Sequence, residues 1–194
     1  MSSSKKNIKA KSRYYAFSAP SGAGKTTIIK RILGKYNNVA VSVSATTRSK
    51  RKGEIDGVDY YFLQRDDFER FVAEDKFLEY EEVHSDYYGT LKETVQKLVD
   101  NGKIVLFDID VNGALNIKNK YPETVLFFIK PPSIDVLIER LQKRKSETDE
   151  TLKQRLKRID YEYSKAPLFD YIILNDDLEK AVCEVETIMM GERC

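Results

Sequence analysis

The sequence has very few residues of the types that build disulfide frameworks and zinc sites. Its 194 residues contain two cysteines, Cys183 and Cys194, and a single histidine, His84. Three such residues cannot supply the four ligands of a structural zinc site, and the scarcity of cysteine excludes a disulfide-rich secreted scaffold. Because reduced thiols are the default for such a chain, we expect a cytoplasmic protein.

Long hydrophobic runs are also missing, and charge of one sign does not dominate. No stretch approaches the roughly 20 apolar residues of a membrane-spanning helix, and the polar segment 1–7 lacks the apolar region of a secretory signal. The net charge is +2. The first 13 residues carry five basic side chains and no acid, so the rest of the chain is at −3. We therefore expect no membrane and no nucleic-acid partner, and any anion site must come from a local cluster.

The residues that are present alternate between two kinds of segment. The chain is 41% hydrophobic and 33% charged, which suits a folded domain. We expect strands at 14–17, 39–44, 58–63, 77–84, 104–110, 125–129 and 171–174, and helices at 25–33, 66–73, 90–101, 131–143, 149–165 and 177–190. Thr90 begins a capping-box pattern and is expected to cap its helix. This alternation predicts an α/β protein whose parallel sheet is flanked by helices.

One segment breaks the alternation, because between 46 and 88 the strands follow one another closely. We expect it to be an antiparallel insertion into a core domain formed by residues 13–45 and 89–194. The charged helices at about 138–160 are expected to form a lid. Residues 1–12 are expected to be a flexible basic leader.

The segment Ala19-Pro20-Ser21-Gly22-Ala23-Gly24-Lys25-Thr26 lies between the first strand and the first helix. This context is typical of a phosphate-binding P-loop, although Ala19 stands where the first glycine is usual. Backbone amides and the helix dipole converge on an anion there, and Lys25 adds a full positive charge. Thr26 offers a hydroxyl to a phosphate-bound Mg²⁺. An ordinary glycine-rich turn is the alternative.

A second cluster of candidate anion ligands follows the second strand. Arg48 and Arg51 lie three residues apart among hydroxyl side chains, an arrangement that suits bidentate binding of phosphate oxygens. Ligands bind at strand ends in such sheets, and this loop follows a strand as the P-loop does. Two anion sites at neighbouring strand ends predict two phosphorylated ligands that meet. A solvated basic loop is the alternative.

Two further groups carry charge where a nucleotide is expected. Asp108 and Asp110 follow the most apolar strand, the usual place for a carboxylate that holds Mg²⁺ or its water. Residues 110–113 also match the D-x-x-G of GTPases, but no base-reading Asn-Lys-x-Asp follows. Arginines of the predicted lid could reach a transferring phosphoryl group, and ordinary solvated helix faces are the alternative; they are Arg140, Arg144, Arg155 and Arg158.

Together these motifs make the chain resemble guanylate kinase over residues 14 to about 190. The resemblance rests on segments in the family's order and spacing: 20–25, 42–48, Gly53-Glu54 with Gly57 and Tyr60, 87–89, 108–110 and 175–177. The chain departs from the family at Ala19, at Thr90 where Ser is common, and at Asn112 where Gln is usual. Ala19 is tolerable if its φ is negative.

The resemblance implies a role for each group of residues. ATP would be bound by Ser21, Gly22, Ala23, Gly24, Lys25, Thr26, Thr27 and Asn175, the last near the adenosine. GMP would be bound in the insertion and at the strand ends by Ser44, Arg48, Arg51, Glu54, Tyr60, Glu79, Tyr88, Thr90, Asp108 and Asp110. Glu79 would accept hydrogen bonds from guanine N1–H and its 2-amino group, and Thr90 would donate to O6. The resemblance assigns catalysis to Lys25, Arg48, Arg140, Arg144 and Arg155, and Mg²⁺ to Thr26 and, through water, Asp108.

The reaction that follows is transfer of the γ-phosphoryl group of ATP to GMP, giving ADP and GDP. The partners are ATP and GMP, with dGMP left open, and a monomer or weak homodimer is expected. Guanylate-kinase-like scaffold domains bind phosphopeptides without catalysis, but they typically lose the P-loop and the lid arginines that this chain keeps. A kinase of another small phosphorylated substrate disagrees with the pair Glu79 and Thr90, and a GTPase switch lacks its base-reading motif.

Overall fold

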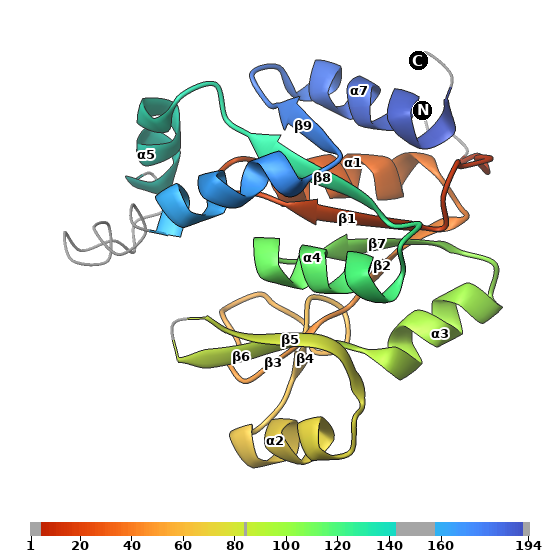
Figure 1. Cartoon of the computed structure of the whole chain (residues 1–194), viewed down its shortest axis with the longest axis vertical. Coiled ribbons are helices and arrows are strands. Elements are labelled where there is room, and N and C mark those ends of the chain that lie inside the picture. The colour runs from red at the N-terminus through yellow and green to blue at the C-terminus, as the bar shows by residue number, and fades with distance from the viewer. Residues whose placement is uncertain (1–4, 84, 143–157, 192–194) are drawn as a thin grey trace.

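The computed structural model describes residues 5–83, 85–142 and 158–191 (Figure 1). A five-stranded parallel sheet with strand order β2-β7-β1-β8-β9 forms the centre of the molecule. Its strands are β1 (Tyr14–Ser18), β2 (Val39–Ser42), β7 (Ile104–Asp108), β8 (Val125–Lys130) and β9 (Tyr171–Leu174). The predicted α/β architecture with a parallel sheet is confirmed.

Helices cover both faces of this sheet, because its inner strands are apolar on both sides (Figure 1). Tyr15 and Phe17 of β1 pack with α1 (Lys25–Lys35) and α7 (Leu178–Met190). Tyr14 and Ala16 point to the opposite face and pack with α3 (Lys92–Asp100) and α4 (Val111–Lys120). The period of two along the strand thus divides the interior into two cores, one on each side of the sheet.

A smaller sheet projects from the first, with strand order β4-β3-β6-β5. Its strands are β3 (Ala45–Thr46), β4 (Tyr61–Phe62), β5 (Phe77–Val83) and β6 (Asp86–Leu91), and α2 (Arg65–Ala73) covers one face. Phe68 of α2 stacks on Phe77 with ring centroids 4.3 Å apart. The sheet is mixed rather than antiparallel as expected, because β3 and β4 run parallel.

Three expected strands are shorter than their sequence pattern predicts, and one of them, 104–110, is β7 and ends at Asp108. The run 39–44 contains only β2, which ends at Ser42, and the next strand, β3, begins at Ala45 in the smaller sheet, so the chain passes from one sheet to the other between these two residues. The run 58–63 reduces to β4, because turn hydrogen bonds use the residues before it: Gly57 N–H donates to the Tyr60 carbonyl at 2.8 Å.

Several helices begin at residues other than those expected, and α5 begins at Ile134 rather than at 131. The helix expected at 90–101 is α3, and it begins at Lys92 after Leu91, which makes no side-chain cap. Thr90 lies in β6 instead, and its hydroxyl donates to Glu79, so cross-strand pairing replaces the predicted capping box. The helix α2 begins at Arg65, one residue before the expected Asp66, and its Gln64 cap makes no side-chain hydrogen bond.

Helix α4 is absent from the expected elements, because its stretch of Asn and Gly residues lacks a clear helical period. Asp110 caps it by accepting a hydrogen bond from Gly113 N–H at 2.8 Å. The D-x-x-G pattern at 110–113 is therefore a helix N-terminus in this fold. Further along the chain, α5 (Ile134–Gln142), a helical segment at 158–165 and the short η1 (Ala166–Leu168) lead to β9.

The leader is not free over its described part. Ile8 is buried in the same core as residues of α1 and α7, and its backbone exchanges two hydrogen bonds with the Asn38 side chain at 2.9 and 2.7 Å. Lys11 N–H donates to the Met189 carbonyl at 2.8 Å. Residues 5–12 thus form a strap that runs from residues 35–38, at the end of α1, to the end of α7, whereas the sequence predicts a flexible leader. Within the described ranges, no helix has the length and apolar character needed to cross a bilayer.

Candidate active site

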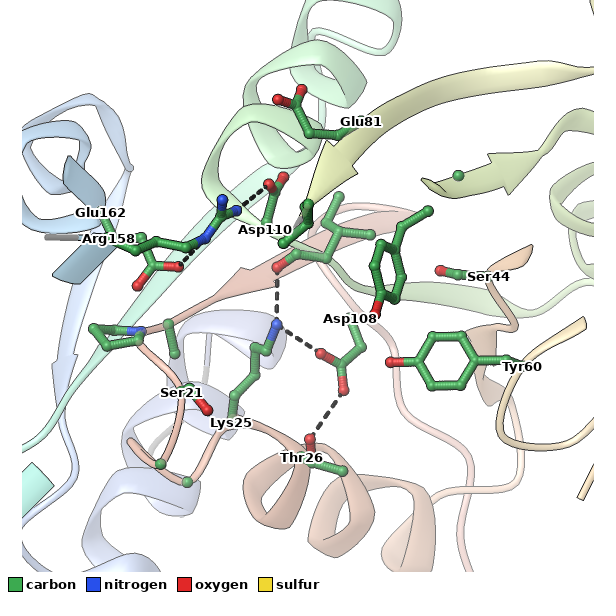
Figure 2. Close-up of a pocket in the computed structure, with 18 of the residues that line it drawn as sticks. Ser21, Lys25, Thr26, Ser44, Tyr60, Glu81, Asp108, Asp110, Arg158 and Glu162 are labelled. Carbon is green, nitrogen blue, oxygen red and sulfur yellow. Dashed lines mark hydrogen bonds and ion pairs between the residues drawn. The ribbon is translucent and has the colours of Figure 1, made fainter. Parts of the chain in front are cut away.

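A pocket of about 370 Å³ opens where the carboxyl ends of β1 and β7 face the smaller sheet (Figure 2). Figure 2 shows Lys25 and Asp108 near its middle, Ser44 and Tyr60 on one side, and Arg158 with Glu162 on the other. Its lining comes from both sheets: Ala19, Pro20, Ser21, Gly22, Gly24, Lys25, Thr26, Thr27, Ser44, Tyr60, Glu79, Glu81, Val83, Tyr88, Gly89, Asp108, Ile109, Asp110, Arg158 and Glu162.

The P-loop forms one wall of the pocket. Gly22 and Gly24 have φ of 92° and 97°, values that side-chain-bearing residues rarely adopt, and α1 begins directly afterwards at Lys25. Ala19 has no such positive φ, since Asp75 and Ser85 are the only described non-glycine residues that do. The alanine at this position therefore imposes no backbone strain. No acidic residue lies in the first turn of α1, so the positive end of its dipole is free to face an anion.

Lys25 is held at the centre of the pocket by neighbours from β7 and the residue after it. Its ammonium group lies 2.7 Å from Asp108 Oδ1 and donates to the Ile109 carbonyl at 2.8 Å. This contact follows from topology, because β1 and β7 are adjacent parallel strands and their carboxyl ends share one edge. The lysine side chain is 19% exposed, so its charge is available to a ligand in the pocket.

The residues beside Lys25 fit a magnesium ion bound together with phosphates. Thr26 Oγ1 donates to Asp108 Oδ2 at 3.2 Å, which places a hydroxyl and a carboxylate next to each other. Both are hard oxygen donors, and Mg²⁺ typically takes one or two protein oxygens and completes its shell with phosphates and water. A complete protein cage is not offered: in the described ranges, no three His, Cys, Asp or Glu side chains group as metal ligands.

A second cationic group, Arg48, lies at the edge of the smaller sheet. Its guanidinium forms a bidentate pair with Glu54, at 3.0 and 2.8 Å, and lies over the rings of Tyr60 and Phe62 at 5.2 and 5.6 Å. The pair lowers the pKa of Glu54 and raises the pKa of Arg48. Glu54 therefore orients Arg48, and as an anion it is a poor direct ligand for a phosphate. Arg51 gives its backbone N–H to Glu54, while its side chain is exposed and does not line the pocket.

Glu79 and Thr90 face each other across β5 and β6. They are register partners, and Thr90 Oγ1 donates to Glu79 Oε1 at 2.6 Å. Glu79 is only 8% exposed, and its burial raises the pKa of this carboxyl to about 7. The Thr90 hydrogen bond opposes that rise, whereas the charges of Asp110 and Glu81 add to it. The carboxyl group thus lies in a dry site that favours a hydrogen-bond donor as its partner.

Hydroxyl groups complete the side of the pocket formed by the smaller sheet. Ser44 is buried, and the rings of Tyr60 and Tyr88 meet edge to face at 6.1 Å. Burial raises the pKa of Tyr60, so its phenol stays a hydrogen-bond donor at neutral pH. These side chains and Arg48, which lies over Tyr60 and is not itself part of the pocket lining, form a group of hydrogen-bond donors separate from the P-loop.

The opposite side of the pocket contains one of the arginines expected in the lid, Arg158, together with Glu162, which the motifs do not single out. Arg158 donates to Asp110 Oδ2 at 2.9 Å and lies 3.4 Å from Glu162 Oε1. Burial raises the pKa of Glu162 to about 7, while Arg158 and Lys25 oppose the rise. The i,i+4 spacing of Arg158 and Glu162 is the signal that could have paired them, but only the fold brings them to the pocket. Glu81 also lines the pocket, and it does so because it lies two residues beyond Glu79 on β5.

Some predicted site residues have other roles or lie elsewhere. Asn175 is buried and donates to the Ala23 carbonyl at 2.7 Å, so the contact that it makes here braces the P-loop. Arg140 belongs to α5, but its side chain falls outside the described part of the chain. Arg144 and Arg155 lie wholly outside the described residues.

The comparisons with known proteins agree with this geometry. The guanylate kinase family model matches residues 11–192. Guanylate kinase from Clostridium perfringens (strain SM101) is 47% identical over 177 residues, covering 91% of this chain and 82% of the relative. The guanylate kinase of Chlorobium chlorochromatii is also 47% identical, over 95% and 97% of the two chains.

A solved structure extends the likeness to three dimensions. The crystal structure of guanylate kinase from Anaplasma phagocytophilum matches with a TM-score of 0.76 and 32% sequence identity, over 97% of this chain and 88% of that one. Sequence and fold thus agree over nearly the whole length of the chain. The chain belongs to the guanylate kinase family.

Proposed function

We propose how this pocket divides the work of the guanylate kinase reaction, in which ATP and GMP give ADP and GDP. One observation carries the proposal: a single pocket is lined by the P-loop on one side and by Glu79, Ser44, Tyr60 and Tyr88 on the other. A donor phosphate and an acceptor nucleotide can therefore meet over Lys25. The P-loop and Arg158 also distinguish the chain from a scaffold domain that only binds peptides.

The P-loop is the proposed donor side. Its amides, with Ser21, Gly22, Ala23, Gly24 and Thr27, would hold the phosphates of ATP, and Lys25 would balance the charge near the transferred group. Thr26 and Asp108 are the proposed Mg²⁺ ligands, and the bound ion would neutralise phosphate charge. The bond between Asn175 and the Ala23 carbonyl supports a bracing role for that side chain.

The hydroxyl and guanidinium groups of the smaller sheet are the proposed acceptor side. Arg48, kept in place by Glu54, would bind the phosphate of GMP together with Ser44, Tyr60 and Tyr88. Arg51 would have to turn inward from its exposed position to join them. This arrangement holds one phosphate at each side of Lys25, as transfer between two nucleotides requires.

Base selection is assigned to Glu79 and Thr90. An ionised Glu79 would accept from guanine N1–H and its 2-amino group, and Thr90 would donate to O6. Adenine presents no such pair of donors, so the buried carboxylate would be left unpaired, which is a strong penalty. Asp110 lies beside Glu79 and is a further candidate contact, whereas Asp108 faces Lys25 and Thr26.

The chemistry requires alignment and charge neutralisation but no general base. A phosphate monoester with a second pKa of about 6 is mostly dianionic at pH 7, so an oxygen of GMP is already a nucleophile. It attacks the γ-phosphorus of ATP, and the bond to the bridging oxygen breaks as ADP leaves with the electron pair. Cations around the transferred group stabilise the developing charge. Arg140, Arg144 and Arg155 are proposed to contribute when the lid closes and excludes water.

A coupled ADP-release assay with GMP, dGMP, AMP, CMP and UMP tests the proposal. We expect Mg²⁺-dependent turnover with GMP and at least about 10³-fold lower kcat/KM with AMP. Lys25→Met should abolish turnover, while Arg48→Ala should raise the KM for GMP and leave the KM for ATP nearly unchanged. Equal activity on AMP would contradict the base assignment, and unchanged GMP kinetics in Arg48→Ala would remove Arg48 from the site.

A further inference from the structure

Gly113 lies in the first turn of α4, where nothing in the backbone requires glycine. Its φ is not positive, unlike that of six other described glycines. Glycine inside a helix is less stable than alanine, because it has more conformational freedom to lose. A requirement other than backbone conformation must therefore account for the missing side chain.

The space beside Gly113 is already occupied by the Glu79 carboxyl group. A Cβ atom at this position would lie 2.8 Å from Glu79 Oε2 and 3.3 Å from Glu79 Cδ. It would also lie 3.2 Å from Asp110 Oδ1, the atom that accepts the Gly113 N–H. A carbon and an oxygen do not approach to 2.8 Å without a bond, so one of the two groups would have to move.

Glu79 has little freedom to move aside. Its side chain is buried, and Thr90 donates to its other oxygen at 2.6 Å. Its backbone is fixed by the pairing of β5 with β6. Thr90 therefore holds the carboxyl group from one side, and the bare Cα of Gly113 bounds it on the other.

We propose that Gly113 is a specificity-determining residue, whose missing side chain makes the seat for the Glu79 carboxyl group. This inference rests on the proposed reading of guanine by Glu79. A methyl group at 113 pushes Oε2 away from α4, and the carboxyl group then either loses its Thr90 bond or tilts from the plane that guanine presents. Both changes weaken GMP binding, and neither affects ATP binding by the P-loop.

The direct test is Gly113→Ala, assayed with GMP, AMP and ATP. We expect kcat/KM for GMP to fall at least about tenfold, the preference for GMP over AMP to fall with it, and the KM for ATP to stay within about twofold. Gly34→Ala is the matched control, because Gly34 is an exposed glycine of α1 and an added Cβ there would meet nothing within 4 Å. Its kinetics should equal those of the parent. Unchanged GMP kinetics in Gly113→Ala would overturn the inference.

A double-mutant cycle distinguishes the effect of the contact between residue 113 and Glu79 from a general structural effect of the substitution. In a Glu79→Ala background the space is empty, so adding Gly113→Ala should leave kcat/KM for GMP unchanged and should not lower the melting temperature, because alanine favours the helix. In the parent background the same substitution should lower both. A loss of equal size in both backgrounds would contradict the inference even if Gly113→Ala alone folds poorly. If Glu79→Ala itself leaves GMP kinetics unchanged, the guanine assignment fails and this inference falls with it.

Discussion

Arg158 donates to the Asp110 carboxylate over 2.9 Å, and this ion pair joins the helical segment 158–165 to the first turn of α4. The Tyr161 hydroxyl makes a second link to that turn, donating to Asn112 Oδ1 at 2.7 Å. Asn112 Nδ2 in turn donates to Glu81 on β5 at 3.2 Å. The first turn of α4 therefore contacts both sides of the pocket.

Replacing Arg158 by glutamine should weaken both stability and catalysis. Asp110 and Glu162 would lose their shared cation, and a poorly solvated carboxylate without a partner costs about 1–3 kcal/mol of unfolding free energy. We expect kcat/KM for GMP to fall about tenfold. Denaturant unfolding of the same preparation measures the loss of stability. Arg31→Gln, which breaks an exposed pair with Glu179, is the control and should change little. A parent-like melt together with parent-like kinetics would show that the Arg158 pair has no such role.

The raised pKa of Glu79 predicts that GMP binds more weakly in acid. Its pKa of about 7 means that the carboxyl group is largely neutral below pH 7, while guanine requires the carboxylate. The KM for GMP should therefore rise about tenfold for each pH unit below 7 and level off above it. The KM for ATP, measured in the same series, reports titration of groups outside the guanine site, and protonation of the GMP phosphate adds to the rise only below about pH 6. Thr90→Val should shift the rise to higher pH, because the Thr90 hydrogen bond lowers this pKa. A flat GMP profile from about pH 5.5 to 8 would contradict the prediction.

The same pKa has an opposite consequence for the stability of the protein without nucleotide. Glu79 titrates near 4.5 when unfolded and near 7 when folded, so its contribution to stability is lost as pH rises through 7. Glu79→Gln should therefore gain stability relative to the parent between about pH 4.5 and 8, by at most about 3 kcal/mol. Urea unfolding at both pH values measures the difference, and a constant gap between the two proteins would contradict it.

Glu54 is predicted to act through Arg48. Glu54→Gln removes the charge that holds the guanidinium over Tyr60 and Phe62, so Arg48 must be ordered by GMP at the time of binding. We expect the KM for GMP to rise about fivefold to tenfold with little change in the KM for ATP. Glu69→Gln is the control, since it breaks an exposed ion pair with Arg65 in the same part of the chain. If both variants behave alike, the orientation of Arg48 does not depend on Glu54.

The strap formed by residues 5–12 should stabilise the fold without affecting catalysis. Asn38→Ala removes both hydrogen bonds to the Ile8 backbone, and we expect a loss of about 1–3 kcal/mol in unfolding free energy. The Ile8 side chain packs in the core and does not line the pocket, so kcat and both KM values should stay near the parent. Thermal unfolding measures the expected loss of stability, and the coupled assay on the same preparation measures the unchanged kinetics. A parent-like melting temperature would show that the strap is not needed for stability.

The sequence predicts those parts of the site that local chemistry determines. The P-loop is contiguous, and its glycines have the positive φ that the motif requires. The meeting of Lys25 with Asp108 also follows from pattern, because two apolar strands with polar residues at their carboxyl ends belong to one parallel sheet.

The remaining features depend on packing between distant segments. Thr90 has the local pattern of a helix cap, yet its hydroxyl is used by a neighbouring strand. Helix α4 is hard to predict from the sequence because it contains Gly113, a poor helix former. A glycine at this position leaves room for the Glu79 carboxyl group. Arg158 and Glu162 have the spacing of an ordinary exposed pair, and the packing of the segment 158–165 beside α4 brings them into the pocket lining.

Guanine recognition by Glu79 is tested most directly by the ratio of kcat/KM for GMP to that for AMP, in the parent and in Glu79→Gln. Glutamine keeps the size of the side chain, but its amide presents a donor where the carboxylate accepts. The parent ratio should be at least about 10³ and should fall by about 10² or more in the variant, through loss of GMP activity. A ratio that stays the same in Glu79→Gln would contradict the assignment of guanine recognition to this buried carboxyl group.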